Sequence, residues 1–217
     1  MIVKEVLKLN SNWSCIVDEN SKLKIEDIGK FSNIKLDEMK VPSNWELEGL
    51  HNYSGVVWFI KYFSVSQKEI IKNLKILEFN GVDYNADVWL NDEYLGTHEG
   101  YFQKFFFDVS EKIKSENRIV VKVNSPKEDV EKHWPLKKQL IKGIFNHHDC
   151  RPGGWSKVHG QDRNTGGIWN DVQIIFSNKA YIENLKVRPQ INYEKNSALL
   201  LVEDRKSVVE GKCVDLG

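Results

Sequence analysis

Apolar and polar residues alternate along the stretch from residue 75 to residue 109, and this alternation predicts consecutive β-strands. The expected strands are residues 75–79, 85–90, 93–97 and 101–109, each bounded by Gly, Asn or Asp, which tolerate the dihedral angles of tight turns. In the second strand Ala86, Val88 and Leu90 alternate with Asp87 and Trp89, so that one face is apolar. Strands with so many aromatic residues indicate the core of a β-sandwich.

The same patterning predicts further strands on both sides of this stretch. Residues 56–65 form a nearly continuous apolar run, which is expected at the centre of a sheet. Residues 7–17, 118–123 and 167–176 are expected as the first, a later and the closing strand. Residues 66–73 and 111–117 are polar and are expected to be connections. The Lys-rich stretch between residues 18 and 40 shows no pattern that assigns it.

Residues 125–167 interrupt this series of strands. The segment is more than 40 residues long, and connections beyond about 12–15 residues without regular structure are usually functional or disordered. It contains four of the six His residues, Trp134, Trp155 and the dense polar block at residues 146–154. Aromatic residues together with Gly turns favour a folded binding loop over a flexible insertion.

The C-terminal part of the chain predicts a change of domain. Alternation restarts over residues 180–202, as expected for the first two strands of a second β-domain. Residues 204–217 change character again and resemble the translation of a synthetic sequencing adapter. The expected organisation is one domain over residues 1–178, the start of another over 179–203, and a non-native tail over 204–217.

Composition narrows the classes of partner. The 217 residues include 31 Lys and Arg and 31 Asp and Glu, and the resulting net charge of zero gives no electrostatic reason to expect nucleic acid or a membrane as partner. The start of the chain is too charged for a signal peptide, so a cytoplasmic location is expected. Cys15, Cys150 and Cys213 lack paired or metal-type spacing, which fits a reducing compartment.

Three stretches carry a resemblance to a known family. Residues 79–109 (FNGVDYNADVWLNDEYLGTHEGYFQKFFFDV), preceded by residues 41–65 and followed by residues 164–176, resemble the N-terminal sugar-binding domain of glycoside hydrolase family 2. This family contains β-galactosidases, β-glucuronidases and β-mannosidases, and the likeness extends over residues 9–189. It implies an all-β fold: a jelly-roll (galactose-binding-domain-like) β-sandwich followed by a truncated immunoglobulin-like β-domain.

The resemblance implies the first domain of a retaining β-glycosidase, which hydrolyses O-glycosyl bonds of a carbohydrate. In this family both catalytic glutamates belong to a (β/α)8 barrel, which needs about 250 residues, and neither its Asn-Glu pair nor its His-Tyr-Pro motif is found here. No catalytic residue is therefore expected in this chain, and the fragment should be inactive alone. Its expected partners are the β-glycoside substrate and the missing immunoglobulin-like and barrel domains of the same protein.

Two positions match side chains with which family members contact the terminal sugar. Asn52, three residues before Gly55, matches the first, and its amide can donate to and accept from a hydroxyl. The alternative is that Asn52 caps the turn before the next strand. The second is an acidic residue just upstream of the closing strand, where Gln161 aligns without a gap and Asp162 aligns after a one-residue shift. Asp162 is favoured, with Gln161 beside it; the alternative is a surface pair of Asp162 with Arg163.

His147, His148 and Asp149 are the remaining candidate substrate-binding residues. One histidine is expected to face the sugar or the barrel, while the other packs inward. A transition-metal site is disfavoured because adjacent residues of a strand point to opposite sides and no metal-binding motif is present. A metal-dependent enzyme that uses these three residues and His159 is the alternative. No cofactor is expected; Na⁺ or Mg²⁺ lies near the sugar in some family members but matches no residues here.

The other functional class that the sequence allows is a stand-alone, non-catalytic carbohydrate-binding module. Such a module would bind sugar through exposed aromatic residues such as Trp134 or Trp155. The turn at Glu99, Gly100 and Tyr101 is interpreted as structural, since Gly100 permits a backbone bend and Tyr101 can pack against the core.

Overall fold

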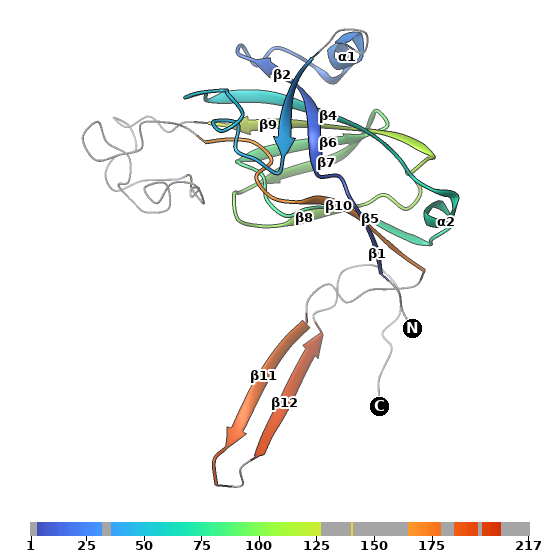
Figure 1. Cartoon of the computed structure of the whole chain (residues 1–217), viewed down its shortest axis with the longest axis vertical. Coiled ribbons are helices and arrows are strands. Elements are labelled where there is room, and N and C mark those ends of the chain that lie inside the picture. Colours follow the sequence, from blue (N-terminus) through green and yellow to red (C-terminus); the bar gives the residue numbers. More distant parts are fainter. Residues whose placement is uncertain are drawn as a thin grey trace, which may run out of the picture. The chain divides into compact units, whose positions relative to one another are not determined.

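The computed structural model describes residues 4–31, 36–126, 140, 165–178, 185–194 and 197–204. By its internal contacts the chain divides into two compact units, one formed by Val3–Asn178 and the other by Met1–Ile2 with Lys179–Gly217. The first unit consists mainly of two antiparallel sheets, which Figure 1 shows as two layers. It is a β-sandwich, as the sequence predicted.

The larger sheet has six strands in the order β3-β2-β4-β9-β6-β7. Their bounds are Ser11–Asp18 for β2, Asp37–Val41 for β3, Gly55–Ser64 for β4, Asn85–Leu90 for β6, Glu93–Glu99 for β7 and Glu116–Ser125 for β9. The smaller sheet has four strands in the order β1-β10-β5-β8. Its strands are β1 (Glu5–Lys8), β5 (Leu74–Phe79), β8 (Phe105–Asp108) and β10 (Val172–Ser177).

The main core lies between the two sheets. The predicted apolar face of β6 is confirmed, because Ala86, Val88 and Leu90 are all fully buried in this core. Central β4 buries both of its faces. Phe59 belongs to the main core, whereas Trp58 packs with Ile28 in a second cluster on the outer side of the sheet.

The second cluster has a simple structural origin. The short helices α1 (Ile25–Ile28) and η1 (Gly29–Phe31) follow β2, and Ile25 and Ile28 of α1 supply apolar side chains to the outer side of the six-stranded sheet. Since both faces of β4 are covered, its sequence is a continuous apolar run rather than an alternating one. These helices and β3 lie in the stretch that the sequence left unassigned.

Several predicted bounds differ from the structure. The predicted first strand is two strands in different sheets, β1 and β2, divided at Leu9 and Asn10. The predicted strand at residues 101–109 is shortened to β8. The predicted closing strand begins only at Val172, because Gly167 has a positive φ of 116° and forms an isolated bridge with Asp83.

A helix also lies in a predicted connection. α2 spans Gln67–Ile70, and the Glu69 carboxylate accepts a hydrogen bond of 2.9 Å from the backbone N–H of Ser66. A Ser followed three residues later by Glu is a sequence signal for a helix start. The sequence therefore contained a signal for this helix, although the polar composition of residues 66–73 predicted a connection.

The second unit contains one described supersecondary element. β11 (Leu185–Asn192) and β12 (Ser197–Asp204) form an antiparallel hairpin, so the two strands that alternation predicted there are present. That they begin an immunoglobulin-like domain stays a prediction. Within the described ranges, no helix has the length and apolar character needed to span a membrane.

Candidate functional site

A buried carboxylate links two distant parts of the chain at the edge of the sandwich that is formed by strand ends, next to the last residue of β9. Asp83 is only 1% exposed. Its Oδ1 lies 3.0 Å from the Ser125 hydroxyl, and its Oδ2 accepts a hydrogen bond of 2.9 Å from Thr165. The Ser125 hydroxyl also lies 2.5 Å from the Thr165 carbonyl oxygen. We call Asp83, Ser125 and Thr165 the Asp83 clamp.

The Asp83 clamp brings together residues on either side of the long connection. Ser125 is the last residue of β9, and Thr165 begins the described segment that leads into β10. The clamp therefore joins the two ends of residues 126–164, the long connection that the sequence marked as a candidate binding loop. A buried carboxylate within hydrogen-bond distance of two hydroxyls ties these two segments together, because polar groups persist in a protein interior where they are hydrogen-bonded.

Backbone hydrogen bonds hold residues 165–168 on both sides. On one side, the backbone N–H of Asp83 donates to the Gly167 carbonyl at 2.9 Å. On the other side, Ser43 donates to Ile168 at 3.0 Å and Trp45 donates to Gly166 at 2.9 Å. The segment that follows the long connection thus lies between the Asp83 turn and residues 43–45.

Gly166 allows the close approach of the Trp45 ring. A Cβ atom at this position would lie 2.0 Å from Cζ2 of Trp45, which is far too short for two carbon atoms. Trp45 is buried, and its ring makes an edge contact with Tyr53 at a centroid distance of 5.6 Å. The segment that carries Asn52 is therefore packed directly against the end of the long connection.

Asn52 is exposed in a turn just before β4. Its φ is 52°, and its backbone N–H donates a hydrogen bond of 2.6 Å to the Glu46 carboxylate. The Asn52 side-chain amide makes no hydrogen bond to any residue that the structure describes. The turn is thus capped by Glu46, and the capping role that the sequence allowed for Asn52 is not what its side chain does here.

Strand pairing places this turn beside the Asp83 clamp. Gly55, three residues after Asn52, is paired with Ser125 in the β4–β9 register. Trp45, on the other side of the turn, bonds to Gly166. Asn52 therefore belongs to a chain segment that contacts both ends of the long connection.

The residues after Gly167 are fixed by an aromatic stack. Trp169 stacks on Tyr101 at a centroid distance of 4.9 Å and donates from Nε1 to the Tyr101 carbonyl at 3.2 Å. Tyr101 is 1% exposed, and Gly100 before it has a φ of 130°. The structural interpretation of the turn at residues 99–101 is confirmed.

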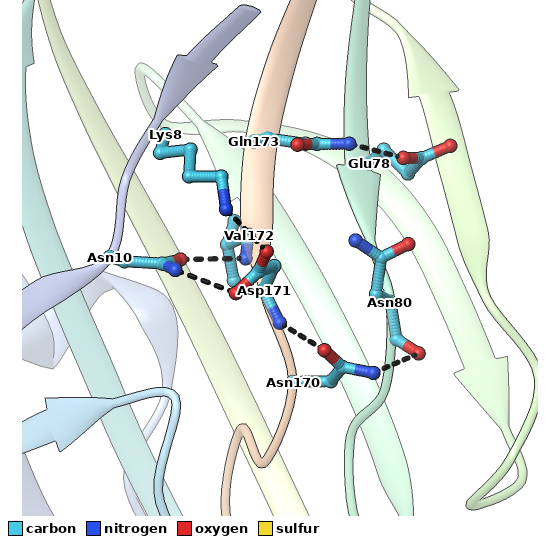
Figure 2. A network of polar contacts seen from close by, with 8 residues as sticks. All are labelled: Lys8, Asn10, Glu78, Asn80, Asn170, Asp171, Val172 and Gln173. Carbon is cyan, nitrogen blue, oxygen red and sulfur yellow. Dashed lines mark hydrogen bonds and ion pairs between the residues drawn. The ribbon is translucent and has the colours of Figure 1, made fainter.

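A polar network then anchors the start of β10, as Figure 2 shows. The Asp171 carboxylate accepts hydrogen bonds from Lys8 at 2.9 Å and from Asn10 at 2.7 Å, and Asn10 accepts one from the Val172 N–H at 3.2 Å. The Lys8 ammonium and then Asn10 lower the pKa of Asp171. Asn10, at the break between β1 and β2, thus ties the two sheets to the segment that leaves the site.

The other predicted site residues are not among those that the structure describes. These are Gln161, Asp162, His147, His148 and Asp149, together with His159, Trp134 and Trp155 of the alternative readings. Their roles stay predictions. In the described ranges, no group of three or more His, Cys, Asp or Glu side chains could hold a metal ion.

Sequence reasoning missed the residues that build this edge. Asp83 follows Gly81 and Val82 between two predicted strands, where an Asp is ordinarily taken as a turn residue. Ser125 and Thr165 are 42 and 82 residues away from it. No local pattern signals that three such residues meet; the Gly166-Gly167 pair is a local sign of a close backbone approach, but it does not say to which residue.

The fold and this edge define a class of protein: a jelly-roll β-sandwich with a long connection anchored at one rim. Residues 53–170 match the family model described as glycosyl hydrolase 2 galactose-binding domain-like. The chain therefore belongs to the glycosyl hydrolase 2 family, through a galactose-binding-like domain.

Individual relatives agree with this assignment. A β-galactosidase of Thermoanaerobacter pseudethanolicus is 33% identical over 129 residues, which are 56% of this chain and 17% of that protein. A β-galactosidase of Thermoanaerobacterium thermosulfurigenes is 24% identical over 92% of this chain and 25% of its own length. A solved β-glucuronidase from an uncultured Clostridium shares the fold, with a TM-score of 0.63 and 24% identity over 93% of this chain and 34% of that one. The chain thus spans about a third or less of these proteins.

Proposed function

We propose that this chain is the N-terminal sugar-binding domain of a longer retaining β-glycosidase, which hydrolyses O-glycosyl bonds with a catalytic barrel encoded further along the gene. Membership of the glycosyl hydrolase 2 family supports the reaction class. The small share of each relative that the chain covers supports the existence of further domains. On its own the chain would bind sugar weakly and hydrolyse nothing.

The observation that carries this proposal is the arrangement around the Asp83 clamp. Asn52 is exposed in the segment whose residues Gly55 and Trp45 contact the two ends of the long connection, and its amide, which bonds to no described residue, can pair with a hydroxyl. Asp162 precedes Thr165 by three residues, a covalent reach of at most about 11 Å. Asn52 and Asp162, with Gln161 beside it, would thus contact the same terminal sugar.

The contribution of these residues to the reaction would be positioning. Hydrogen bonds from Asn52 and Asp162 to sugar hydroxyls would hold the ring while two barrel carboxylates, about 5–5.5 Å apart in retaining enzymes, carry out the chemistry. Interactions that strengthen in the transition state raise kcat, whereas those equal in both states lower KM alone. His147, His148 and Asp149 would supply further polar contacts from the same connection.

The test uses the full-length gene product and a panel of β-galactosides, β-glucuronides and β-mannosides. In that enzyme Asp162→Ala is expected to lower kcat/KM at least ~10-fold, about 1.4 kcal/mol of transition-state stabilisation. Asn52→Ala should also lower kcat/KM. The matched controls, Asp37→Ala and Asn20→Ala, replace exposed residues and should leave kcat/KM unchanged.

Two outcomes would contradict the proposal. A gene that ends after the sandwich would instead support the stand-alone binding module. Near-normal kcat/KM for Asp162→Ala in an active enzyme would remove this residue from the sugar site. Circular dichroism of each variant separates loss of a contact from loss of the fold.

A further inference from the structure

The outer face of the six-stranded sheet carries a groove that is separate from the edge described above. Its volume is about 460 Å³, and one wall is formed by residues 23–26 around the start of α1. Trp58, Asp87, Trp89, Tyr94 and Lys122 form the rest of the lining. Asp87 and Trp89 point to this side because their neighbours in β6 fill the main core on the other side.

Three aromatic rings follow one another along the groove. Trp58 is buried, and its ring centroid lies 5.6 Å from that of Trp89. Trp89 lies 5.2 Å from Tyr94, its cross-strand partner in β7. Tyr94 is 51% exposed, so the aromatic row runs from the protein interior to an accessible end.

Charged groups border this aromatic row. The Tyr94 hydroxyl donates a hydrogen bond of 3.1 Å to Asp87 Oδ1, which fixes both side chains and leaves Oδ2 able to accept another bond. The Lys122 ammonium lies 5.5 Å from the centre of the Trp58 ring. Within the described part of the chain, Lys122 makes no ion pair and donates no hydrogen bond.

Asp87 and Lys122 are neighbouring residues of opposite charge that do not form a salt bridge with each other. The two residues are directly paired in the β6–β9 register and lie on the same face of the sheet. Side chains at such positions have Cβ atoms about 4.5–5.5 Å apart and commonly form a salt bridge. Here the carboxylate turns to Tyr94 and the ammonium lies over Trp58, so that an acceptor and a donor flank the aromatic surface without neutralising each other.

From this geometry we propose that the groove is a second carbohydrate-binding site, which takes a neutral pyranose unit of an oligosaccharide. The C–H face of the sugar ring would pack on Trp89 and Tyr94, because aromatic faces bury apolar surface at a defined geometry. Sugar hydroxyls would donate to Asp87 and accept from Lys122 through charge-assisted hydrogen bonds.

The charge of the groove selects a neutral ligand. Its lining contains two acidic residues, Glu26 and Asp87, and two basic ones, Lys24 and Lys122. With equal numbers of each sign, the lining offers no net attraction to an anionic or a cationic sugar, so a neutral ligand fits it. The site shares no residue with the Asp83 clamp or with Asn52, so it does not depend on the function proposed above.

The test is a titration of the full 217-residue chain with neutral tetrasaccharides, cellotetraose and β-1,4-galactotetraose, and with anionic tetragalacturonate. Trp89 lies in the groove, so we expect a saturable change in tryptophan fluorescence with a neutral ligand, confirmed by calorimetry. Tyr94→Ala should weaken binding at least ~10-fold, since it removes the accessible stacking ring. Lys122→Gln should weaken it about 5-fold, because a charged donor is replaced by a neutral one.

Tyr62→Ala is the matched control. Tyr62 is another exposed tyrosine, 60% accessible, and lies on β4 of the same sheet outside the groove. The proposal requires unchanged binding in Tyr62→Ala. Absence of binding to both neutral tetrasaccharides, or binding that survives Tyr94→Ala and Lys122→Gln together, overturns it. Tighter binding of tetragalacturonate than of the neutral ligands overturns the choice of a neutral sugar.

Discussion

Buried carboxylates in this domain lie where segments that are distant in sequence meet. Asp18 accepts hydrogen bonds from the backbone N–H groups of Lys22 and Leu23, each at 3.0 Å, and from Trp58 Nε1 at 3.3 Å. It thereby fixes the end of β2 to the outer cluster, as Asp83 fixes the ends of the long connection. A buried charge persists only where donors compensate for its lost hydration.

His98 is a half-buried residue with one uncompensated polar atom. Its ring stacks on Phe105 at a centroid distance of 4.1 Å, and its Nε2 has no hydrogen-bond partner among the described residues. Burial is the main reason that the pKa of His98 is lowered from its ordinary value of 6.5. The folded protein therefore takes up the proton at lower pH than the unfolded chain does.

This difference predicts a pH-dependent stability. Between the folded pKa and about 6.5 the unfolded chain binds more protons, so the free energy of unfolding should fall as the pH drops through this window. His98→Phe keeps a ring on Phe105 and removes the titrating group, so urea unfolding at pH 7.5 and at pH 5 should differ less in the variant. His51→Phe, at an exposed position, is the control. Equal pH dependence of His98→Phe and the parent protein would contradict the assignment.

The elements at the functional edge are positioned by contacts with other elements and not by their own propensity. Residues 165–168 form no regular strand, yet backbone bonds to residues 43–45 and to Asp83 hold them on both sides. The absence of a side chain at Gly166 lets the Trp45 ring lie against them. The two ends of the connection are therefore positioned by residues that lie outside it.

Removal of the Asp83 carboxylate tests how firmly those ends are held. Asp83→Ala removes the Thr165 hydroxyl's acceptor and one of the two acceptors near the Ser125 hydroxyl, which keeps the Thr165 carbonyl. Loss of a buried hydrogen-bond partner costs about 1–3 kcal/mol, so we expect the free energy of unfolding in urea to fall by roughly that amount. Asp83→Asn keeps the shape and one oxygen acceptor, so its free energy of unfolding should lie between those of the parent protein and Asp83→Ala.

The control for this measurement is Asp37→Ala. Asp37 is exposed at the start of β3, and surface substitutions usually change stability by less than about 0.5 kcal/mol. A loss in Asp83→Ala no larger than that in Asp37→Ala would show that the clamp does not stabilise the domain.

At the scale of the whole molecule, the described residues of the sandwich form a core of their own. The buried residues of the main cluster run from Leu9 to Phe176. The described side chains of the β11–β12 hairpin include large exposed residues, such as Tyr193 at 85%. A hairpin of two strands is at best marginally stable by itself, whereas two packed sheets are stable.

We therefore predict that residues 1–178 fold alone. Their urea midpoint should equal that of the full chain to within about 0.2 M, since the surface exposed on unfolding the sandwich is the same. A chain of residues 1–170 is the control: it lacks β10, which lies between β1 and β5, and should show no cooperative transition. If residues 1–178 did not unfold cooperatively, the sandwich would need residues after 178 for its stability.

The sequence alone determined the fold class and much of the strand layout. The alternation in β6 and the continuous run in β4 identified the two kinds of buried strand, and the family resemblance came from the same residues. Both signals are local, because a side chain's direction along a strand follows from its position in the sequence. Local signals also sufficed for the bend at Gly100.

Only the tertiary structure decided which polar groups meet. The joining of Ser125 and Thr165 by Asp83 and the separation of Asp87 from Lys122 depend on the pairing of segments that are distant in sequence. The energy of such contacts depends on burial and on exact donor positions. Periodicity along the chain reports which face a residue occupies, but it does not report which residue lies across from it.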